Sequence, residues 1–327
     1  MSNKIAVLGA GAWGTALACA MAKAGHNVHL WGRDAAVLEE IAAHQKNSRY
    51  LGDIALADGL QVSTGLAQSV AGAQVILLVT PAQSIAQMVT DLSAIVTPDQ
   101  IIIACAKGID QDSGKTPAEL ISILVARENV GALSGPSFAK DVAKGLPTAV
   151  TLAFHDLTRA REFSTLLSSD NLRIYASDDL VGVELGGALK NVLALAVGAA
   201  RGLQLGASAE AALIARGFGE LRRVAVKMGA KPETLAGLSG LGDLVLTCSS
   251  TQSRNFSYGM ALGRGDNLEG LPLAEGVFSA KIAAKLAHDN GVDAPILEAV
   301  ADVLAEKITA LEAVRQLLAR PLKAENE

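Results

Sequence analysis

Three cysteines in 327 residues, none in Cys-x-x-Cys spacing, are too few for a disulfide framework or a zinc site. Their odd number fits a reducing compartment, and we expect all three to be small buried hydrophobic residues. No group of His, Cys, Asp or Glu has metal-ligand spacing, so no metal is predicted. The five histidines are scattered and Gly-x-Ser-x-Gly is absent, so nothing favours a Ser-His-Asp triad. The cysteines are Cys19, Cys105 and Cys248.

Charged residues are also sparse. Only 19% of the residues are charged, half are hydrophobic, and the formal net charge is −5. This composition excludes a disordered chain and suits a buried sheet flanked by helices. Because no basic cluster stands out, we expect no nucleic-acid partner.

Uninterrupted apolar runs are short. No stretch of about 18 or more apolar residues lacks both glycine and charge, which argues against membrane insertion. Lys4 and the apolar stretch to Ala24 have the composition of a signal peptide. Cleavage there would remove part of the nucleotide-binding unit described next, so we expect a soluble, cytoplasmic protein.

A strand, a glycine motif and a helix occur at the N-terminus in the order that a dinucleotide-binding unit requires. The mostly apolar segment Lys4–Leu8 predicts a buried parallel strand. It is followed by Gly-x-Gly-x-x-Gly, an apolar helical run over Thr15–Ala24, and a second strand over Asn27–Trp31. The alternative interpretation is a glycine-rich turn in some other α/β protein.

Each glycine of the motif has a physical role. Gly9 permits the tight turn from strand to helix, Gly11 lets the backbone approach a pyrophosphate, and Gly14 allows the helix to pack closely on the strand. The N–H groups and the positive dipole end of the helix would then face the phosphates.

The end of the second strand normally selects the cofactor. An acid there binds the ribose 2′-hydroxyl of NAD, whereas an arginine accommodates the 2′-phosphate of NADP. This sequence has Arg33 followed by Asp34. We therefore predict that NADP(H) is accepted and that NAD(H) remains possible, the alternative being that Arg33 is a solvated surface residue.

Apolar runs between helical segments predict an α/β protein with an N-terminal Rossmann-type, doubly wound parallel sheet. Asp34 is expected to cap a helix ending at His44, and residues 45–60 to form a long loop. Beyond Ala176 the periodicity is helical. Residues 1–176 are thus expected to form the NAD(P)-binding domain and residues 177–327 an all-helical substrate and catalytic domain, with a charged tail, residues 323–327, that frays. The later strands are predicted at Val75–Val79, Ile101–Cys105, Val130–Ser134, Thr148–Ala153 and Leu172–Tyr175, and the long helices at Leu180–Ala200, Ala207–Met228, Phe278–Asn290, Ala294–Leu304 and Thr309–Leu318.

Two polar segments directly follow predicted strands, where ligands of such sheets bind. Lys107 is a cation that could meet a phosphate or a substrate oxygen, or could be a surface lysine at a strand end. In the segment Ser134–Lys140, Ser137 can cap the next helix, whose exposed N–H groups could also hold part of a substrate.

A lysine lies in the longest apolar helical run of the second half. Lys190 is surrounded in sequence by Leu, Ala, Val and Gly. Burial favours the neutral amine, which suits a general acid or base. The alternative is a lysine whose ammonium reaches solvent at the helix edge. The preceding pair, Gly186 and Gly187, predicts close backbone approach at a cost in helix stability.

The last polar group is Asp243 together with Ser253, Arg254 and Asn255. A hydroxyl, a guanidinium and an amide in succession are a good set for a phosphate. Asp243 could pair with Lys190 and orient it. The alternative for the second segment is a loop in which Ser253 caps a helix.

Taken together, these motifs resemble those of bacterial-type NAD(P)-dependent sn-glycerol-3-phosphate dehydrogenases over nearly the whole chain. The matching stretches are GAGAWGTALA, the lysine of CAKGI, SGPSFAK, VGVELGGALKNVLA, ARGFGEL, GLGDLVLTC and QSRN. The resemblance implies a Rossmann domain, a helical domain like that of 6-phosphogluconate dehydrogenase, and a homodimer. It also implies reversible reduction of dihydroxyacetone phosphate to sn-glycerol 3-phosphate with NAD(P)H, for phospholipid synthesis.

The resemblance also implies residue roles. Lys190 would exchange the proton of the C2 hydroxyl. The glycerol phosphate would be lined by Lys107, Gly135, Ser137, Lys190, Asp243, Ser253, Arg254 and Asn255. The cofactor would be lined by Gly9, Gly11, Ala12, Trp13, Gly14, Arg33, Lys107, Ala139, Arg254, Leu273 and Glu275.

One segment departs from the family pattern. Around Leu271–Gly276 the chain is shorter than in many members, and Val277, Phe278 and Ser279 stand where a basic residue often follows. This departure weakens the cofactor roles that the resemblance implies for Leu273 and Glu275, but not the role that it implies for Lys190. Two other functions stay open: a sister dehydrogenase acting on a non-phosphorylated substrate, and a non-catalytic NADP(H)-sensing module.

Overall fold

A computed structural model describes residues 3–321 of the chain. The fraying expected of the tail at residues 323–327 lies outside the described residues.

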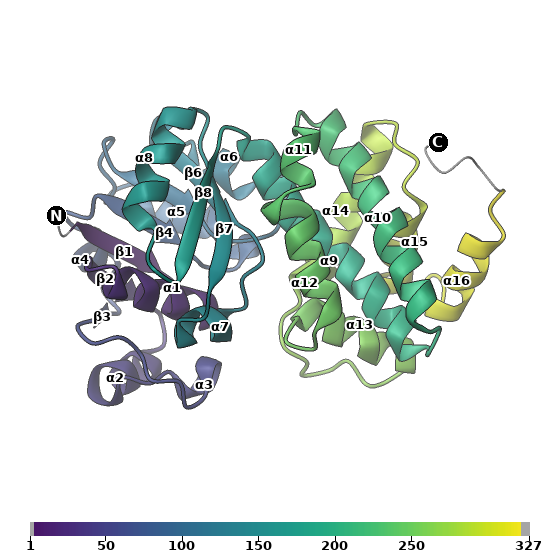
Figure 1. The fold of residues 1–327 in the computed structure, drawn as a ribbon, viewed down its shortest axis with the longest axis horizontal. Coiled ribbons are helices and arrows are strands. Elements are labelled where there is room, and N and C mark those ends of the chain that lie inside the picture. The colour runs from purple at the N-terminus through teal and green to yellow at the C-terminus, as the bar shows by residue number, and fades with distance from the viewer. Residues whose placement is uncertain (1–2, 322–327) are drawn as a thin grey trace. The chain divides into compact units, whose positions relative to one another are not determined.

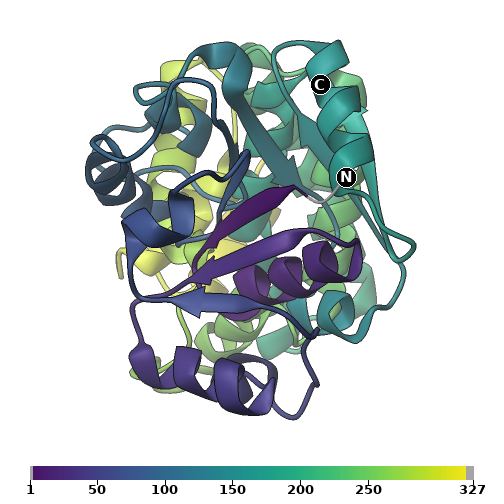
Figure 2. The same ribbon diagram turned by 90° about the vertical axis from the view of Figure 1, so that its left-hand side faces the viewer.

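Eight strands form one sheet in the order β3-β2-β1-β4-β5-β6-β7-β8 (Figure 1). The order from β3 to β6 is that of a Rossmann sheet, and these strands are parallel. Figure 2 shows β1, β2 and β3 as neighbouring purple and blue arrows. The strands are β1 (Lys4–Leu8), β2 (Asn27–Trp31), β3 (Gln61–Ser63), β4 (Val75–Leu78), β5 (Ile101–Ala104), β6 (Val130–Ser134), β7 (Thr148–Ala153) and β8 (Leu172–Ser177).

The direction of the last two strands corrects the prediction of a wholly parallel sheet. β7 pairs antiparallel with β6, and β8 is parallel to β7. The connection from β6 to β7 contains only α7 (Ala139–Lys144), a helix of six residues. Such a helix is about 9 Å long, too short to return the chain to the opposite end of a strand about 17 Å long. The chain therefore enters β7 at the same end of the sheet at which β6 finishes, and the two strands run antiparallel.

Every strand expected from the sequence is present, but β3 was not expected. It has three residues, Gln61–Ser63, none of them fully buried, and pairs with β2 at the edge of the sheet. The predicted loop over residues 45–60 also contains one helical turn, α3 (Ser48–Leu51). The predicted cap of α2 (Ala35–His44) is confirmed, because the Asp34 carboxylate accepts hydrogen bonds from the Ala36 and Val37 N–H groups.

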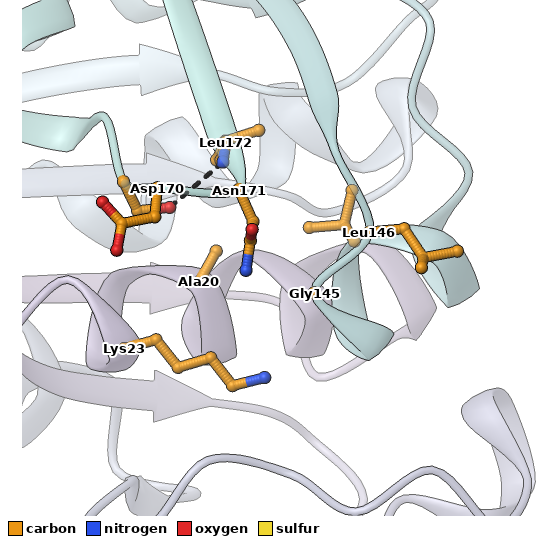
Figure 3. A pocket seen from close by; sticks show the side chains of 9 residues that line it. Ala20, Lys23, Gly145, Leu146, Asp170, Asn171 and Leu172 are labelled. Carbon is orange, nitrogen blue, oxygen red and sulfur yellow. Dashed lines mark hydrogen bonds between the residues drawn. The ribbon is translucent and has the colours of Figure 1, made fainter.

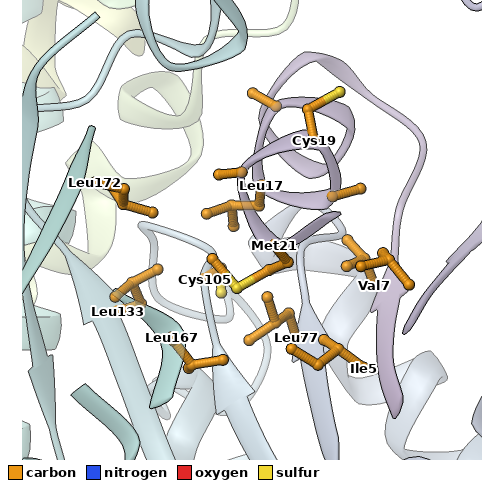
Figure 4. Packing of buried hydrophobic residues seen from close by; sticks show 14 of the residues in the cluster. Ile5, Val7, Leu17, Cys19, Met21, Leu77, Cys105, Leu133, Leu167 and Leu172 are labelled. Carbon is orange, nitrogen blue, oxygen red and sulfur yellow. The ribbon is translucent and has the colours of Figure 1, made fainter. Parts of the chain in front are cut away.

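Two hydrophobic layers cover the two faces of this sheet. Alternate residues of a strand point to opposite faces, so Ile5 and Val7 belong to one layer and Ala6 and Leu8 to the other. Figure 4 shows the first layer, in which Leu17 of α1 (Ala12–Lys23) packs among strand residues. The remaining helices before β8 are α4 (Leu66–Val70), η1 (Ala82–Ser84), α5 (Ile85–Leu92), α6 (Pro117–Ile121), η2 (Arg127–Asn129) and α8 (Leu157–Leu167).

The cysteines are free and buried, as the sequence predicted. Burial raises the pKa of the Cys19 and Cys105 thiols above the usual value. These two side chains therefore act as small apolar groups of the first layer.

The described chain beyond β8 is helical, in agreement with the predicted runs. α9 is long and apolar enough to cross a membrane by length and composition alone, but 89% of its apolar window is buried inside the protein, as in a core helix. The helices are α9 (Leu180–Gly202), α10 (Ala207–Lys227), α11 (Pro232–Leu235), η3 (Leu238–Gly242), α12 (Asp243–Ser249), α13 (Arg254–Arg264), α14 (Glu275–Asp289), α15 (Pro295–Leu304) and α16 (Ala310–Leu318).

A buried carboxylate ties two of these helices together. Glu220 of α10 accepts hydrogen bonds from the backbone N–H groups of Ile296 and Leu297 in the first turn of α15, at 3.0 to 3.1 Å. Ala294, which precedes α15, offers no side-chain cap. Glu220 therefore supplies the missing cap from a neighbouring helix, and its burial raises the pKa of its carboxyl group to about 7.

The chain divides into two compact units. The first, here called the Rossmann unit, extends to Gly187 and adds Gly229–Asp243. The second, here called the helical unit, consists of Ala188–Met228 and the described chain from Leu244 onward. The division thus falls inside α9, and the functional boundary predicted at Ala176 stays a prediction.

Candidate active site

The glycine turn after β1 has the geometry that its three glycines predict. Gly9 has φ +130°, and a Cβ there would lie 2.9 Å from the Val79 carbonyl oxygen. A Cβ on Gly14 would lie 1.8 Å from the Gly9 carbonyl oxygen. Gly11 has ordinary extended backbone, and a Cβ there would meet nothing within 4 Å. Gly9 and Gly14 are thus required by the protein itself, whereas the space beside Gly11 is open.

The first turn of α1 fits a bound pyrophosphate. Gly11 is its N-cap and provides no side-chain acceptor, so the leading N–H groups of this 12-residue helix have no capping side chain. The Nε1 atom of Trp13, in the same turn, is buried and has no hydrogen-bond partner among residues 3–321. Uncapped donors beside an open space are what a dinucleotide phosphate requires.

At the end of β2, the acidic residue is already engaged. One carboxylate oxygen of Asp34 caps α2, and the other pairs with the Arg49 guanidinium at 2.7 Å. Arg33 is exposed, and the described residues give it no ion pair or hydrogen bond. This arrangement leaves Arg33 available to an anion and engages both oxygens of Asp34, and the contact of Arg33 with a 2′-phosphate stays a prediction.

A charged cluster lies where β5 and β6 end in the Rossmann unit. Lys107 donates from Nζ to the Asp243 carboxylate at 2.8 Å and to the Gly135 carbonyl oxygen at 2.8 Å. The Asp243 side chain is 2% exposed and that of Lys107 is 18% exposed. The structure thus brings together Lys107, Gly135 and Asp243, which lie far apart in the sequence.

The neighbouring turn corrects one prediction. Ser137 does not cap α7, because its hydroxyl donates to the Gly135 carbonyl oxygen at 2.9 Å and Phe138 is the N-cap. Gly135 has φ +145°, and a Cβ there would lie 2.9 Å from Val150 Cα. Packing against β7 therefore requires glycine at this position.

Asp243 follows a π-helical turn, η3, which brings its backbone close to α9. A Cβ on Gly186 would lie 2.8 Å from the Ser239 carbonyl oxygen, and one on Gly187 would lie 2.5 Å from the Ser134 Oγ atom. The close backbone approach predicted for the glycine pair is confirmed at Gly186, whereas at Gly187 the close neighbour is a side chain. Single π-helical turns often occur at functional sites.

Lys190 is buried in the helical unit. Its side chain donates from Nζ to the Thr247 hydroxyl at 2.7 Å, and the residue is 5% exposed. An ammonium so buried needs such partners, which excludes the alternative of a lysine reaching solvent at the helix edge. Sequence reasoning missed Thr247, since a threonine inside an apolar helix carries no signal of its own. The expected pairing of Asp243 with Lys190 stays a prediction.

A buried amide pair adjoins Lys190 in sequence. The Asn255 Nδ2 donates to the Asn191 Oδ1 at 2.9 Å, and the Asn255 Oδ1 accepts from the Gly276 N–H at 2.8 Å. Asn255 thereby joins the starts of α13 and α14 to α9. Sequence reasoning gave Asn191 no role, although its polarity within an apolar helix was a usable signal.

The start of α13 combines a helix cap at Ser253 with an exposed Arg254. Ser253 caps the helix, since its hydroxyl accepts from the Phe256 N–H at 3.2 Å. Arg254 is the first helical residue and is exposed. A guanidinium beside the positive end of a helix could hold an anion, and the phosphate role expected of Arg254 stays a prediction.

The remaining predicted cofactor residues lie at the starts of helices. Ala12 opens α1, Ala139 opens α7 and Glu275 opens α14. Leu273 precedes α14 and is 41% exposed.

Another buried carboxylate lies at the start of α9. Glu184 accepts a hydrogen bond from the Ala118 N–H in the first turn of α6 at 2.8 Å. Burial raises the pKa of its carboxyl group to about 7. This residue therefore anchors α6 on α9 within the Rossmann unit.

Two cavities lie apart from these residues. One, of about 90 Å³, is lined by Lys23, Asp170 and Asn171 at the end of α1 and the start of β8 (Figure 3). The other, of about 550 Å³, lies in the helical unit and is lined mainly by apolar residues of α9, α10, α15 and α16. None of the predicted site residues lines either cavity.

A Rossmann sheet with an uncapped glycine turn, followed by a helical unit with a buried lysine, is typical of NAD(P)-dependent oxidoreductases. The family models of the N-terminus and the C-terminus of NAD-dependent glycerol-3-phosphate dehydrogenase match residues 4–160 and 179–315. The chain belongs to the NAD-dependent glycerol-3-phosphate dehydrogenase family. The family expected from the sequence motifs is thereby confirmed.

Known proteins similar to the chain include two bacterial relatives named glycerol-3-phosphate dehydrogenase [NAD(P)+]. The protein from Brucella canis is 54% identical over 326 residues, covering 100% of both chains. That from Mesorhizobium japonicum is 53% identical and covers 99% of this chain and 94% of its own. The solved glycerol-3-phosphate dehydrogenase from Coxiella burnetii has a TM-score of 0.91 and 36% identity, covering 98% of this chain and 99% of its own. A D-mandelate dehydrogenase with NADH, at 17% identity and TM-score 0.64, shares the fold.

Proposed function

We propose that this protein reversibly reduces dihydroxyacetone phosphate to sn-glycerol 3-phosphate with NADPH or NADH, supplying phospholipid synthesis. The observation that carries the proposal is the end-to-end match, at 54% identity, to a relative with that named activity. We further propose a cytoplasmic homodimer, with residues 1–176 as the cofactor domain and residues 177–327 as the substrate and catalytic domain.

Lys190 is proposed as the general acid. The nicotinamide, when bound, supplies the hydride that reaches the C2 carbonyl carbon of the substrate. As that carbon becomes tetrahedral, the carbonyl oxygen gains negative charge and takes a proton from Lys190 Nζ. In the reverse direction, the neutral amine removes the proton from the C2 hydroxyl. The hydrogen bond to Thr247 holds Nζ in place for this exchange.

The cationic and polar groups are proposed to bind the substrate. Lys107, held by Asp243 and the Gly135 carbonyl, is a rigidly oriented cation suited to a substrate oxygen. Arg254 is proposed to hold the phosphate, since its guanidinium offers two parallel donors at a helix start. The full proposed set is Lys107, Gly135, Ser137, Lys190, Asp243, Ser253, Arg254 and Asn255.

The cofactor is proposed to lie along the glycine turn. Its pyrophosphate would meet the first turn of α1, and a 2′-phosphate would meet Arg33. The full proposed set is Gly9, Gly11, Ala12, Trp13, Gly14, Arg33, Lys107, Ala139, Arg254, Leu273 and Glu275.

The direct test follows loss of NADPH absorbance with dihydroxyacetone phosphate, and repeats it with NADH and with unphosphorylated dihydroxyacetone. Rapid oxidation with the phosphate ester alone is expected. Activity on a non-phosphorylated hydroxy acid or sugar would indicate a sister dehydrogenase instead. NADPH binding by folded protein without turnover of any substrate would indicate a sensing module.

Arg254→Ala is expected to raise KM for dihydroxyacetone phosphate by about ten- to a hundredfold, because a charge-assisted hydrogen bond to phosphate is lost. The change in kcat should be smaller. Steady-state kinetics measure both quantities. Arg264→Ala, at the other end of α13, is the control and should behave as wild type. An unchanged KM in Arg254→Ala would exclude the phosphate role.

Arg33→Ala is expected to lower the ratio of kcat/KM with NADPH to kcat/KM with NADH by about tenfold or more, because an ion pair with the 2′-phosphate is lost. Activity with NADH should change little. Arg173→Ala removes an exposed arginine of β8 and serves as the control. If the ratio stays at the wild-type value, Arg33 is a solvated surface residue.

A further inference from the structure

A buried asparagine from the loop after α2 contacts the glycine turn. Asn47 and Thr15 are both 0% exposed. The Asn47 Nδ2 donates to the Ala10 carbonyl oxygen at 3.1 Å and to the Thr15 hydroxyl at 2.8 Å. Thr15 in turn donates to the same Ala10 carbonyl oxygen at 3.4 Å. Two side chains thus hold one backbone carbonyl.

The orientation of this amide follows from its partners. A carbonyl oxygen can only accept a hydrogen bond, so the NH₂ group of Asn47 must face Ala10. Its two hydrogens then match the two acceptors. The Asn47 Oδ1 atom is buried and has no hydrogen-bond partner among residues 3–321. Leaving a buried acceptor unpaired is unfavourable, so this geometry needs a compensating purpose.

The held carbonyl belongs to the peptide that joins Ala10 to Gly11. In a trans peptide the C=O and the following N–H point in opposite directions in one plane. Holding the Ala10 carbonyl against Asn47 and Thr15 therefore turns the Gly11 N–H toward the other side. Free rotation of this peptide would instead let the carbonyl oxygen, which repels phosphate, face the cofactor.

We propose that Asn47 is a positioning residue that presets the Ala10–Gly11 peptide for binding the cofactor pyrophosphate. The inference rests on the proposed function, because it assigns the glycine turn to NADPH. Asn47 touches the turn rather than the cofactor. Its effect is expected on cofactor affinity, with little effect on the rate at saturation.

The test measures the Kd of NADPH by isothermal titration calorimetry, with the melting temperature recorded for each variant. Asn47→Ala is expected to weaken binding by about tenfold or more, since a preset donor to phosphate is lost. Asn47→Asp has nearly the same shape but places an acceptor against the Ala10 carbonyl. The Asn47→Asp protein should bind NADPH no more tightly than the Asn47→Ala protein does. If Asn47 acted only through packing, the Kd of Asn47→Asp for NADPH would instead stay near the wild-type value.

Gln100 provides a matched control in the same unit. It is also buried, and its Nε2 donates to the carbonyl oxygens of Val70 and Ala73 at 3.1 and 2.8 Å. Gln100→Ala should lower the melting temperature to a similar extent while Kd for NADPH stays within about twofold of wild type. An equal loss of affinity in Gln100→Ala and Asn47→Ala would overturn the proposal, because general loosening would then explain both.

Thr15→Val is the milder second variant. It keeps the shape of the side chain and removes only the hydroxyl, so a rise in Kd of about three- to tenfold is expected. Should Asn47→Ala not fold, a wild-type Kd in Thr15→Val would overturn the proposal by itself. At saturating NADPH, kcat and KM for dihydroxyacetone phosphate should stay near wild type in both variants. Wild-type protein that binds NADPH but does not reduce dihydroxyacetone phosphate would defeat the proposed function and leave this inference standing.

Discussion

Lys190→Ala is expected to lower kcat by about a hundred- to ten-thousandfold, the usual contribution of a general acid or base. The Lys190 Nζ is the only group to which this mechanism assigns the proton of the C2 oxygen. Its replacement leaves water to protonate the forming alkoxide. Because no cofactor contact is assigned to this residue, the Kd for NADPH should stay near the wild-type value.

Two measurements and two further variants make this test specific. Single-turnover kinetics at saturating cofactor and substrate report the reduction step itself, and a calorimetric titration reports NADPH binding. Lys281→Ala removes an exposed lysine of α14 and should have wild-type kinetics. Thr247→Val keeps the amine but removes the hydroxyl that accepts a hydrogen bond from Lys190 Nζ, so a smaller loss of kcat, about three- to thirtyfold, is expected. If Lys190→Ala retains more than about a tenth of wild-type kcat, the role assigned to it is wrong.

Gly14→Ala is expected to lower the stability of the fold, whereas Gly11→Ala is expected to weaken cofactor binding. A Cβ on Gly14 would lie 1.8 Å from the Gly9 carbonyl oxygen, so α1 must move away from β1 or the turn must distort. Overpacking of this kind costs about 1–3 kcal/mol and more where backbone must shift. We therefore expect Gly14→Ala to lower the free energy of unfolding by about 3 kcal/mol or more, measured by urea denaturation.

Gly11→Ala should instead fold normally and bind cofactor poorly. Its backbone suits alanine and a Cβ there meets nothing within 4 Å, so the free energy of unfolding should stay within about 0.5 kcal/mol of wild type. The new methyl group would occupy the space proposed for the pyrophosphate, and Kd for NADPH should rise by about a hundredfold. Wild-type affinity in Gly11→Ala would show that the cofactor does not approach this turn.

The local parts of the fold could be predicted from the sequence because they depend on neighbouring residues. β1, β2, β6 and β7 begin and end where the apolar runs do. The Asp34 cap and the Ser253 cap each act on N–H groups two or three residues away. Gly9, Gly14 and Gly186 also behave as predicted, since a missing Cβ has the same consequence wherever backbone approaches closely.

Other features depend on contacts between distant segments and could not be predicted. β3 has no apolar run and exists because β2 offers it hydrogen bonds at the sheet edge. The reversal of β7 follows from a helix too short for a crossover. The correction at Ser137 is local instead: its hydroxyl donates to the Gly135 carbonyl oxygen two residues earlier rather than capping α7, because short-range backbone partners compete for a serine hydroxyl.

The sequence by itself determined the family, the order of elements and which residue types could carry chemistry. The tertiary structure decided the partners: Asp243 for Lys107 across 136 residues, Thr247 for Lys190 across 57, and Ala10 for Asn47 across 37. The physical reason is that periodicity reports which face of an element is buried. The partner of a buried polar group depends on which other element covers that face.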